Sequence, residues 1–362
     1  MAKRALVIGA KVAPLRGPED DAAMMQAMLE GRGFEVDVRI ADRATRAGIL
    51  AGYDRLIAAS QPGDAAVIYY SGHGSYGQVL REDSRSWQAI VPVDYPDSTD
   101  CDWRGVTAWE LSIKQAELTA KTRNVTVILD ACSASQMSRR DQPAPEPGVE
   151  VRTLPHPVAG FGAHLALLRE RYGAAFEAVD PVSNRDAVRL VACGQGETAF
   201  EIPVTSDRTH GVFTTALVEI LTELGDVEVS WVALAAAVRA RVRRRRPTQF
   251  PAIEGPARRR LFSLVEEDET GRLGLDSVAD RLRLAGGVIT GVALDDAYGI
   301  MPMGATAYDA GAALGTVRVD EVHALTSFAA RTAEGPTFPA DAVAFPITRT
   351  AVQCVDGRGL RE

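Results

Sequence analysis

Apolar runs and amphipathic stretches alternate along the first 130 residues of this chain. Short runs without polar interruption are typical of strands buried on both faces, and apolar residues recurring every three or four positions are typical of helices. The pattern predicts strands at 5–9, 34–40, 65–70 and 125–129. It predicts helices at 20–30, 45–60 and 109–121. Strands that alternate with helices indicate an α/β fold with a mainly parallel sheet.

The pattern changes at residues 142–157, which contain five prolines. Proline lacks a backbone N–H and fixes φ, so neither a packed helix nor a central strand tolerates five of them. We therefore expect an exposed loop or linker here. Beyond it, the pattern predicts helices at 165–178, 212–224 and 231–243, and strands at 189–193 and 261–265. The last of these strands is expected to close the α/β region.

Residues 266–362 show no long helical period. Glycine-rich segments alternate there with β-favouring ones, at 286–291, 307–309, 315–319 and 342–347. Short strands separated by glycines are typical of small barrels and sandwiches. The chain is thus expected to hold an α/β domain over 1–265 and a small, mainly-β domain of unknown role over 266–362.

The composition is that of an ordinary globular protein, with 46 % hydrophobic and 24 % charged residues among 362. A net charge of −8 argues against nucleic-acid binding, which requires an excess of positive charge. The N-terminus has no signal-peptide core, and no run reaches the roughly 18 apolar residues of a membrane span. The four cysteines are scattered and form no CxxC pair. We expect a cytoplasmic protein with no nucleic-acid and no membrane partner.

Two reactive side chains each follow a predicted apolar strand. His73 comes three residues after 65–70, and Cys132 comes three residues after 125–129. The carboxyl ends of parallel strands meet at one edge of a sheet, so both side chains can face one crevice. A nearby imidazole can deprotonate a thiol and later protonate a leaving amine, as peptide cleavage requires. The amide N–H groups of Gly74 and Cys132 are candidates for stabilising an oxyanion.

Each reactive residue also has a plainer interpretation. An isolated cysteine after a strand is commonly a small buried hydrophobe, and a histidine in a glycine-rich loop is commonly a turn residue. The two segments occur together, each directly after an apolar strand. That combination favours a catalytic pair.

Three segments together resemble the caspase–metacaspase clan, and bacterial caspase-like proteases in particular. They are Tyr-Tyr-Ser-Gly-His-Gly at 69–74, Ile-Val-Pro-Val-Asp at 90–94 and Asp-Ala-Cys-Ser-Ala at 130–134. Cys132 follows His73 by 59 residues, near the caspase spacing of about 50. The resemblance continues at 191–194, 197–201 and 210–214, and it covers about 4–265.

This resemblance implies a caspase-like α/β/α sandwich. It divides the first domain into a large-subunit segment (1–140), a Pro-rich linker (141–187) and a small-subunit segment (188–265). It also implies a cysteine endopeptidase that acts on proteins or peptides, in a bacterial stress, defence or cell-death pathway. An activator or regulator protein is a further expected partner.

The residue type at Asp130 predicts which side chain precedes the cleaved bond. Caspases that cut after Asp carry Gln two residues before the nucleophile, whereas a carboxylate there repels acids and pairs with Arg or Lys. Charge-assisted hydrogen bonds to Arg are worth roughly 1.5–3 kcal/mol, enough for tenfold to hundredfold discrimination. Arg is expected over Lys because its planar fork fits two carboxylates.

Metacaspases, which cut after basic residues, place a second pocket Asp in an Asn-Asp-Ala motif. The matching segment here is Asp-Asp-Ala at 20–22, so the resemblance implies Asp21 as a pocket residue and Ser71 as another. The helix dipole also favours a carboxylate at position 21, near a helix N-terminus, and both interpretations stay open.

Many metacaspases bind activating calcium through an Asp-Asp pair after the Val-Pro-Val-Asp segment. Ala108 and Trp109 occupy those positions here and supply none of the hard oxygen ligands that calcium requires. Asp97, Asp100 and Asp102 lie nearby, but their spacing matches no calcium loop. We expect no metal, no cofactor and no calcium requirement.

The Pro-rich region lies where caspase-like enzymes are commonly cut to mature. Arg139, Arg140 and Arg152 match the expected preference for basic residues, so self-cleavage within the 136–187 loop is a hypothesis. An exposed spacer explains the same region equally well. A further basic run at 239–246 is better explained by the dipole of a helix C-terminus than by nucleic-acid docking or a cleavage site.

An alternative from another class is a catalytically silent scaffold or signalling module that acts through the C-terminal β-domain. The intact His–Cys pair disfavours it, because a scaffold needs neither residue. A non-proteolytic thiol enzyme such as an amidase gains little support from the paired pocket aspartates.

Overall fold

The structure is a computed structural model of the chain. It describes residues 1–348 apart from 79–85, 133–148, 153–159, 180–183, 185, 195–196, 206–207, 226–227, 267–270, 279–280, 288–291, 324–325, 333–336 and 340. The chain divides into two compact units, residues 1–226 with 230–266 and residues 227–229 with 267–362. Each unit has its own sheet architecture.

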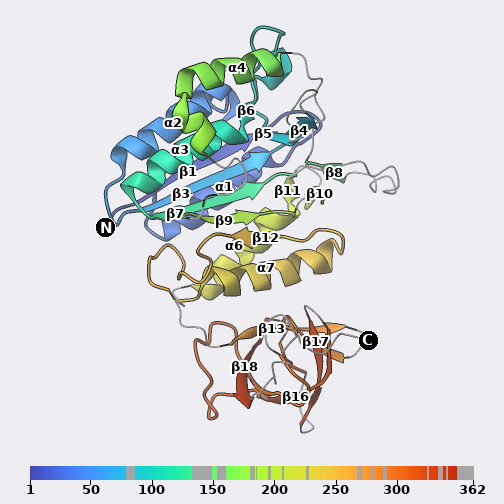
Figure 1. Cartoon of the computed structure of the whole chain (residues 1–362). Coiled ribbons are helices and arrows are strands. Elements are labelled where there is room, and N and C mark those ends of the chain that lie inside the picture. The colour runs from blue at the N-terminus through green and yellow to red at the C-terminus, as the bar shows by residue number, and fades with distance from the viewer. Residues whose placement is uncertain are drawn as a thin grey trace, which may run out of the picture. The chain divides into compact units, whose positions relative to one another are not determined.

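A six-stranded sheet forms the centre of the first unit (Figure 1). In spatial order its strands are β12 (Ala252–Glu254), β9 (Val188–Val191), β7 (Asn124–Asp130), β3 (Ala65–Gly72), β1 (Lys3–Ala10) and β2 (Glu35–Ile40). Neighbouring strands are parallel except β12, which runs antiparallel to β9. Every residue of β3 is buried, as its apolar run predicts for a strand covered on both faces.

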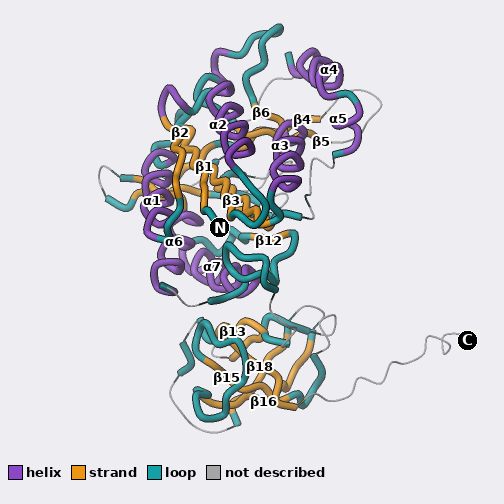
Figure 2. The backbone as a smooth tube through the Cα atoms, turned by 90° about the vertical axis from the view of Figure 1, so that its left-hand side faces the viewer, coloured by secondary structure: helices purple, strands orange, loops and turns teal. Residues whose placement is uncertain are grey.

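Helices cover both faces of this sheet (Figure 2). The five that do so are α1 (Pro18–Gly31), α2 (Arg46–Ala59), α3 (Ala108–Lys121), α6 (Val212–Leu224) and α7 (Trp231–Arg245). On one face α1 packs against α6 and α6 against α7, whereas α2 and α3 pack together on the other. The predicted α/β/α sandwich is confirmed. Among the described residues, no helix is both long and apolar enough to cross a membrane.

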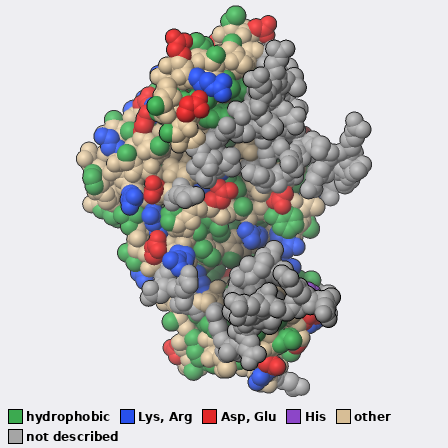
Figure 3. Space-filling model, viewed as in Figure 1, with side chains coloured by type: hydrophobic (Ala, Val, Ile, Leu, Met, Phe, Trp, Pro, Cys, Tyr) green, Lys and Arg blue, Asp and Glu red, His purple; other side chains and the backbone are tan. Residues whose placement is uncertain are grey.

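The basic run at 239–246 falls on α7 and just beyond it. Lys and Arg side chains gather over this helix in the space-filling view (Figure 3), and its last turn is basic. Arg241 pairs with Glu223, and Arg245 pairs with Glu219, both on α6. Some of the basic charge is therefore used in holding two helices together.

The sequence predicts one helix over 165–178, but the chain forms two here. They are α4 (Phe161–Tyr172) and α5 (Ala174–Ala178). Gly173 separates them with a φ of 49°, which an α-helix excludes. The break lets Phe176 stack on Trp109, with ring centroids 5.8 Å apart.

Two small antiparallel sheets lie beside the carboxyl ends of the central strands (Figure 1). One consists of β4 (Gly74–Gln78), β5 (Ser86–Ile90) and β6 (Val106–Thr107). The other consists of β11 (Thr209–Gly211), β10 (Phe200–Pro203) and β8 (Glu150–Val151). Two 3₁₀ turns, η1 (Ala41–Arg43) and η2 (Tyr95–Asp97), complete the unit. These elements were not predicted, because most are too short to show a hydrophobic period.

The strand predicted at 261–265 is wrong. These residues form turns, and the strand that closes the sheet is β12, about ten residues earlier. Phe262 adopts a φ of 55°, which no strand contains. Its ring packs edge-on against Phe34 at 5.0 Å and Trp231 at 5.1 Å, so the apolar run reflects packing of a turn rather than a strand.

The exposed loop predicted at 142–157 is also wrong where these residues are described. Val149 is 6 % exposed and Arg152 is completely buried. The prolines that motivated the prediction lie on either side of these residues, at 143–147 and 155–157, outside the described ranges.

The second unit is a closed barrel of six strands, which confirms the predicted mainly-β character. Around the barrel they are β13 (Leu273–Val278), β14 (Arg281–Leu284), β17 (Ser327–Arg331), β16 (Gly315–Val322), β15 (Ala297–Met301) and β18 (Val343–Thr348). The β-favouring segment at 307–309 is a loop. The Tyr308 ring of this loop covers Gly299 on β15, and a side chain at position 299 would collide with that ring. Of the segment at 286–291, only 286–287 is described, and it is not a strand.

A buried ion-pair network ties three helices of the first unit together. Glu110 and Thr107 form a capping box at the start of α3. The Glu110 carboxylate also accepts from Arg46 of α2 at 2.5 and 3.1 Å and lies 3.3 Å from His164 of α4. Burial opposes this charge, but the hydrogen bonds from His164 and Arg46 outweigh it and lower the pKa of Glu110 to about 2.

Glu110→Gln is expected to lower the free energy of unfolding at pH 7 by about 3 kcal/mol, because Arg46 loses its partner. A depressed pKa contributes stability above the unfolded value of 4.5, and this stability is lost as pH falls toward about 2. The difference from wild type should therefore shrink over that range. All four tryptophans lie in the first unit, so their fluorescence during urea unfolding measures the effect.

Glu117→Gln provides the matched control for this network. Glu117 lies on the same helix but is 44 % exposed and pairs with Lys114. Surface pairs contribute little, so its loss should change stability by less than about 1 kcal/mol. Equal stability of the two variants at pH 7 would contradict the role given to Glu110.

Candidate active site

His73 and Cys132 lie just beyond the ends of two adjacent parallel strands, β3 and β7. The parallel register of β3 and β7 pairs Ser71 with Asp130, and each reactive residue lies two positions beyond. A Cβ atom on Gly74 would collide with the carbonyl oxygen of Cys132, so the backbones of the two segments touch. Both reactive side chains are buried. The sheet therefore brings the predicted pair to one edge.

A short strand of the same chain lies across this edge. β8 pairs antiparallel with β10, with Val151 opposite Phe200. Arg152 continues the strand, and its N–H donates to the carbonyl oxygen of Ala199 at 3.0 Å. Peptides that bind proteins by strand addition use main-chain pairing of this kind.

The carbonyl group of Arg152 lies at the predicted oxyanion donors. Its oxygen accepts from the N–H of Gly74 at 2.9 Å and from the N–H of Cys132 at 3.2 Å. The Cys132 Sγ atom in turn accepts from the N–H of Ala199 at 3.2 Å. The two donors therefore converge on one carbonyl group, and one of them belongs to the cysteine itself.

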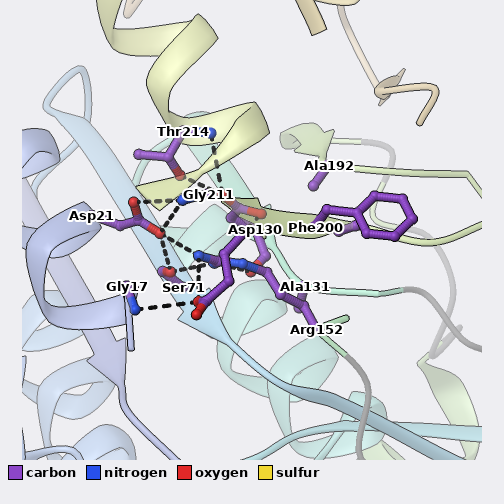
Figure 4. Close-up of polar contacts among 12 residues, drawn as sticks. Gly17, Asp21, Ser71, Asp130, Ala131, Arg152, Ala192, Phe200, Gly211 and Thr214 are labelled. Carbon is purple, nitrogen blue, oxygen red and sulfur yellow. Dashed lines mark hydrogen bonds and ion pairs between the residues drawn. The ribbon is translucent and has the colours of Figure 1, made fainter. Parts of the chain in front are cut away.

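The side chain of Arg152 enters a pocket of buried oxygens (Figure 4). Its Nη2 lies 2.5 Å from Asp21 Oδ2 and 3.5 Å from Glu201 Oε2. Its Nη1 donates to Ser71 Oγ at 2.5 Å and lies 3.5 Å from Asp130 Oδ1. All five side chains are completely buried. The three residues predicted to bind a basic side chain thus contact one guanidinium.

Backbone and hydroxyl donors hold two of these carboxylates in place. Thr214, on α6, donates to Asp130 Oδ2 from its N–H at 3.2 Å and from its hydroxyl at 2.6 Å. The N–H of Gly211 donates to Asp21 at 3.0 Å. A Cβ on Gly211 would collide with Asp130 Oδ2, which explains why glycine is needed there.

Glu201 is the pocket residue that the sequence analysis missed. It lies on β10, two residues after Ala199, and its oxygens accept from the N–H groups of Arg16 at 2.8 Å and Gly17 at 3.2 Å. The segment 197–201 carried some of the family resemblance, but nothing in its spacing marks the acid as buried. An acidic residue between apolar neighbours was the only signal in the sequence.

The three carboxylates share one cation unequally. Burial raises the pKa of Asp130 to about 6 and raises that of Glu201, although the Arg152 guanidinium opposes both shifts. For Asp21 burial is outweighed by the same guanidinium and by hydrogen bonds from His210 and Gly211, so its pKa is lowered. Asp21 is therefore the most firmly ionised acid of the pocket.

The imidazole of His73 is neutral in this arrangement. Burial lowers its pKa to about 4, aided by the Arg152 charge and only partly offset by the carbonyl groups of Ala13 and Val12. Among the described residues, neither ring nitrogen meets a partner in good hydrogen-bonding geometry. A neutral imidazole at the same edge of the sheet as Cys132 is suited to accept a proton from a thiol.

Two of the three acids considered as substitute calcium ligands, Asp97 and Asp102, pair with a cation. Arg104 lies 2.8 Å from Asp102, 3.7 Å from Asp97 and 4.0 Å from Asp94. Within the described ranges, no group of three or more His, Cys, Asp or Glu side chains is arranged to hold a metal ion. Two candidate cleavage residues, Arg139 and Arg140, lie outside the described residues.

Comparison with known proteins identifies the family. The model of the caspase domain, Peptidase C14, matches residues 2–262. The chain therefore belongs to the caspase-domain family of cysteine peptidases. Metacaspase-1 of Mycosarcoma maydis is 32 % identical over 108 residues, which cover 26 % of this chain and 27 % of that protein. The match thus spans about a quarter of the length of that relative.

Two solved structures resemble this chain to different degrees. Protein GSU0716 of Geobacter sulfurreducens superposes with a TM-score of 0.51 at 21 % identity, over 70 % of this chain and 93 % of that one. Caspase-1 of Spodoptera frugiperda gives a TM-score of 0.40 at 13 % identity, over 72 % and 89 %. At these identities the first likeness shows a common fold.

Arg152→Met, made in a Cys132→Ala chain, is expected to lower the free energy of unfolding by about 3 kcal/mol at pH 8. The substitution leaves three buried carboxylates without a cation. The loss should be smaller at pH 5, because Asp130 and Glu201 then take up protons, as their raised pKa values favour. Urea unfolding followed by tryptophan fluorescence measures both values.

Arg55→Met is the control for this substitution. Arg55 pairs with Asp37 at the surface and is 54 % exposed, so its loss should have little effect at either pH. If the Arg152 and Arg55 variants were equally stable at pH 8, the buried charge cluster would not carry the stability assigned to it.

Proposed function

We propose that this protein is a cysteine endopeptidase that cleaves proteins and peptides after arginine. The observation that carries the proposal is the position of Arg152. Its side chain lies among three buried carboxylates, while its carbonyl oxygen accepts from the N–H groups of Gly74 and Cys132. A bound substrate with arginine before the cleaved bond would present the same groups to the same partners.

The chemistry follows from these positions. His73 takes the thiol proton, and Cys132 Sγ forms a bond to the carbonyl carbon of the substrate arginine. The N–H groups of Gly74 and Cys132 stabilise the oxygen that becomes negative. The C–N bond then breaks as His73 returns its proton to the departing amine. Water, deprotonated by His73, hydrolyses the thioester and restores the thiol.

The pocket favours arginine over lysine because the oxygens of the pocket side chains surround a planar guanidinium group. One terminal nitrogen of Arg152 contacts Asp21, and the other donates to Ser71. A lysine ammonium is a single point of charge and cannot serve both ends of the site at once. An acidic side chain would be repelled by every charged group of the pocket.

The first target of the enzyme is its own chain. Pairing of β8 with β10 already seats Arg152 in the position of a residue to be cleaved, so we propose self-processing at the bond between Arg152 and Thr153. Cleavage there falls between the segments that resemble the large and small subunits of caspases. Arg139 and Arg140 remain further candidates.

Calcium independence, a cytoplasmic setting and a regulator protein also belong to the proposal. The first is supported by Ala108 and Trp109, which offer no ligands, and by Arg104, which pairs with the nearby acids. A role in a bacterial stress, defence or cell-death pathway is supported by the family resemblance alone. The C-terminal barrel is the natural candidate for contact with a regulator.

Fluorogenic peptides that differ only in having Arg, Lys, Asp or Ala before the cleaved bond test the specificity. Wild type is expected to cleave after Arg, more slowly after Lys and not after Asp, with equal rates in EDTA and in added calcium. Cys132→Ala should abolish all cleavage. Glu201→Gln should raise KM for the Arg peptide by about tenfold or more, whereas Glu219→Gln, on the surface of α6, should not.

The specificity, the calcium independence and the peptidase activity each have their own contrary outcome. Cleavage after Asp would contradict the acidic pocket but keep the peptidase, and dependence on added calcium would contradict calcium independence. Silence of wild type, together with no selective labelling of Cys132 by an arginine-directed electrophile, would favour the scaffold alternative.

Self-processing is tested by incubating purified protein and determining the mass and N-terminal sequence of its fragments. Wild type is expected to produce a fragment beginning at Thr153, and Cys132→Ala is expected to stay intact. Arg152→Ala should remove this cut because the pocket loses its cation, whereas Arg140→Ala should retain it. A fragment beginning at residue 153 in the Cys132→Ala protein would point to another protease.

A further inference from the structure

The two oxygens of Asp21 face different groups. Oδ2 accepts from Ser71 at 2.8 Å and from Arg152 at 2.5 Å, inside the pocket. Oδ1 accepts from the N–H of Gly211 at 3.0 Å and lies 3.3 Å from Nδ1 of His210. A carboxylate only accepts hydrogen bonds, so Nδ1 must carry the hydrogen in this contact. His210 is thus bound to the same carboxylate as the arginine, from the opposite oxygen.

The surroundings of His210 make it a group that can titrate. It is 8 % exposed and lies on β11, opposite Ile202 of β10. The charged groups that act on it are Asp21 and Asp20, both on α1, and Arg208, just before β11. On β10, the residue next to Ile202 is the pocket acid Glu201, which is the titratable group of that strand nearest to this position in sequence.

We propose that His210 is a positioning residue for the arginine pocket, which shares Asp21 with the substrate and so makes affinity for basic side chains depend on pH. A proton on His210 and a cationic side chain in the pocket both draw on the single charge of Asp21. Binding of arginine therefore weakens the hold of His210 on its proton. The inference rests on the proposed function and extends it by assigning a pH response to substrate binding.

The sign of the effect follows from the charges. The hydrogen bond that His210 donates to Asp21 raises the pKa of His210, burial opposes the shift, and the charges of Asp21 and Asp20 add to it. An empty pocket leaves Asp21 free to stabilise the imidazolium further, whereas an occupied pocket does not. Affinity for a cationic side chain must then fall as pH drops through the pKa of His210 in the empty pocket, with release of a proton on binding.

Glutamine separates this role from a purely structural one. Its side-chain amide can donate to Asp21 as the neutral imidazole does, but it does not titrate. His210→Gln should keep the high affinity of wild type at high pH and lose some of the decline at low pH. His210→Ala removes the donor as well, so it should bind more weakly even at high pH.

The test measures binding without catalysis. A full-length chain with Cys132→Ala and Arg152→Ala leaves the pocket open and prevents cleavage, and benzamidine serves as a planar cationic probe. Calorimetric titration between about pH 5.5 and 8, in two buffers of different ionisation enthalpy, gives the dissociation constant and the number of protons released. The same titrations are made with His210→Gln and His210→Ala added, and with His323→Gln, which lies in the barrel, as control.

Between high and low pH, the affinity for benzamidine is expected to fall in both chains, and the fall should be at least roughly threefold larger in the open-pocket chain than in the His210→Gln chain. One linked proton allows a change in affinity of up to about tenfold per pH unit. Proton release should be correspondingly smaller in the His210→Gln chain. Asp130 also titrates in this range and is present in every variant, so only the difference between chains is assigned to His210. The His323→Gln chain should behave as its parent.

Identical pH profiles and proton release with and without His210→Gln would overturn the inference, as would a failure of benzamidine to bind at any pH. The outcome is separable from that of the proposed function, which is measured by peptide cleavage in the wild-type chain. If wild type cleaves after arginine but proton release on benzamidine binding is equal with and without His210→Gln, only the role of His210 would be rejected. Linkage without any cleavage would support His210 and reject the peptidase.

Discussion

The burial of one guanidinium among three carboxylates is the constraint on which the site depends. An unpaired charge is expensive in a protein interior, so Arg152, Asp21, Asp130 and Glu201 are stable there only together. Asp21, Asp130 and Glu201 lie on α1, β7 and β10, and Arg152 directly follows β8, so the charges fix how these elements meet. Backbone N–H groups and hydroxyls complete the shell. The side chains of Asp130 and Arg152 leave no room for a side chain at Gly211.

The second feature, a histidine and a cysteine at one edge of the sheet, follows from strand register. β3 and β7 are neighbours in a parallel sheet, and each reactive residue lies two positions beyond the register pair of Ser71 and Asp130. The close approach of Gly74 to the Cys132 carbonyl then sets the two N–H groups on one carbonyl oxygen. Under the proposed function, the sheet thus positions the reacting groups, and the pocket acids on neighbouring elements select the side chain.

The same chain supplies both the site and an occupant for it. The segment from Glu150 to Arg152 uses main-chain pairing, a buried cation and a carbonyl contact, which are the three features by which a peptide would be held. Access for any other peptide therefore requires that this segment leave. Asp21 also contacts His210, so the coupling proposed between protonation and occupancy of the pocket would run through one carboxylate.

The sequence by itself determined the class of fold, the mainly-β character of the second unit, and the candidate site residues His73, Cys132, Asp21, Ser71 and Asp130. All of these rest on local signals: apolar runs long enough to show a period, and short motifs directly after them. The tertiary structure alone decided the place of Arg152 and of Glu201, whose partners lie up to 185 residues away along the chain. Strands of two to four residues, such as β8 and β10, have no period to detect. A proline-rich stretch predicts exposure, and only long-range charge pairing overrides that prediction by giving a buried arginine its counter-ions.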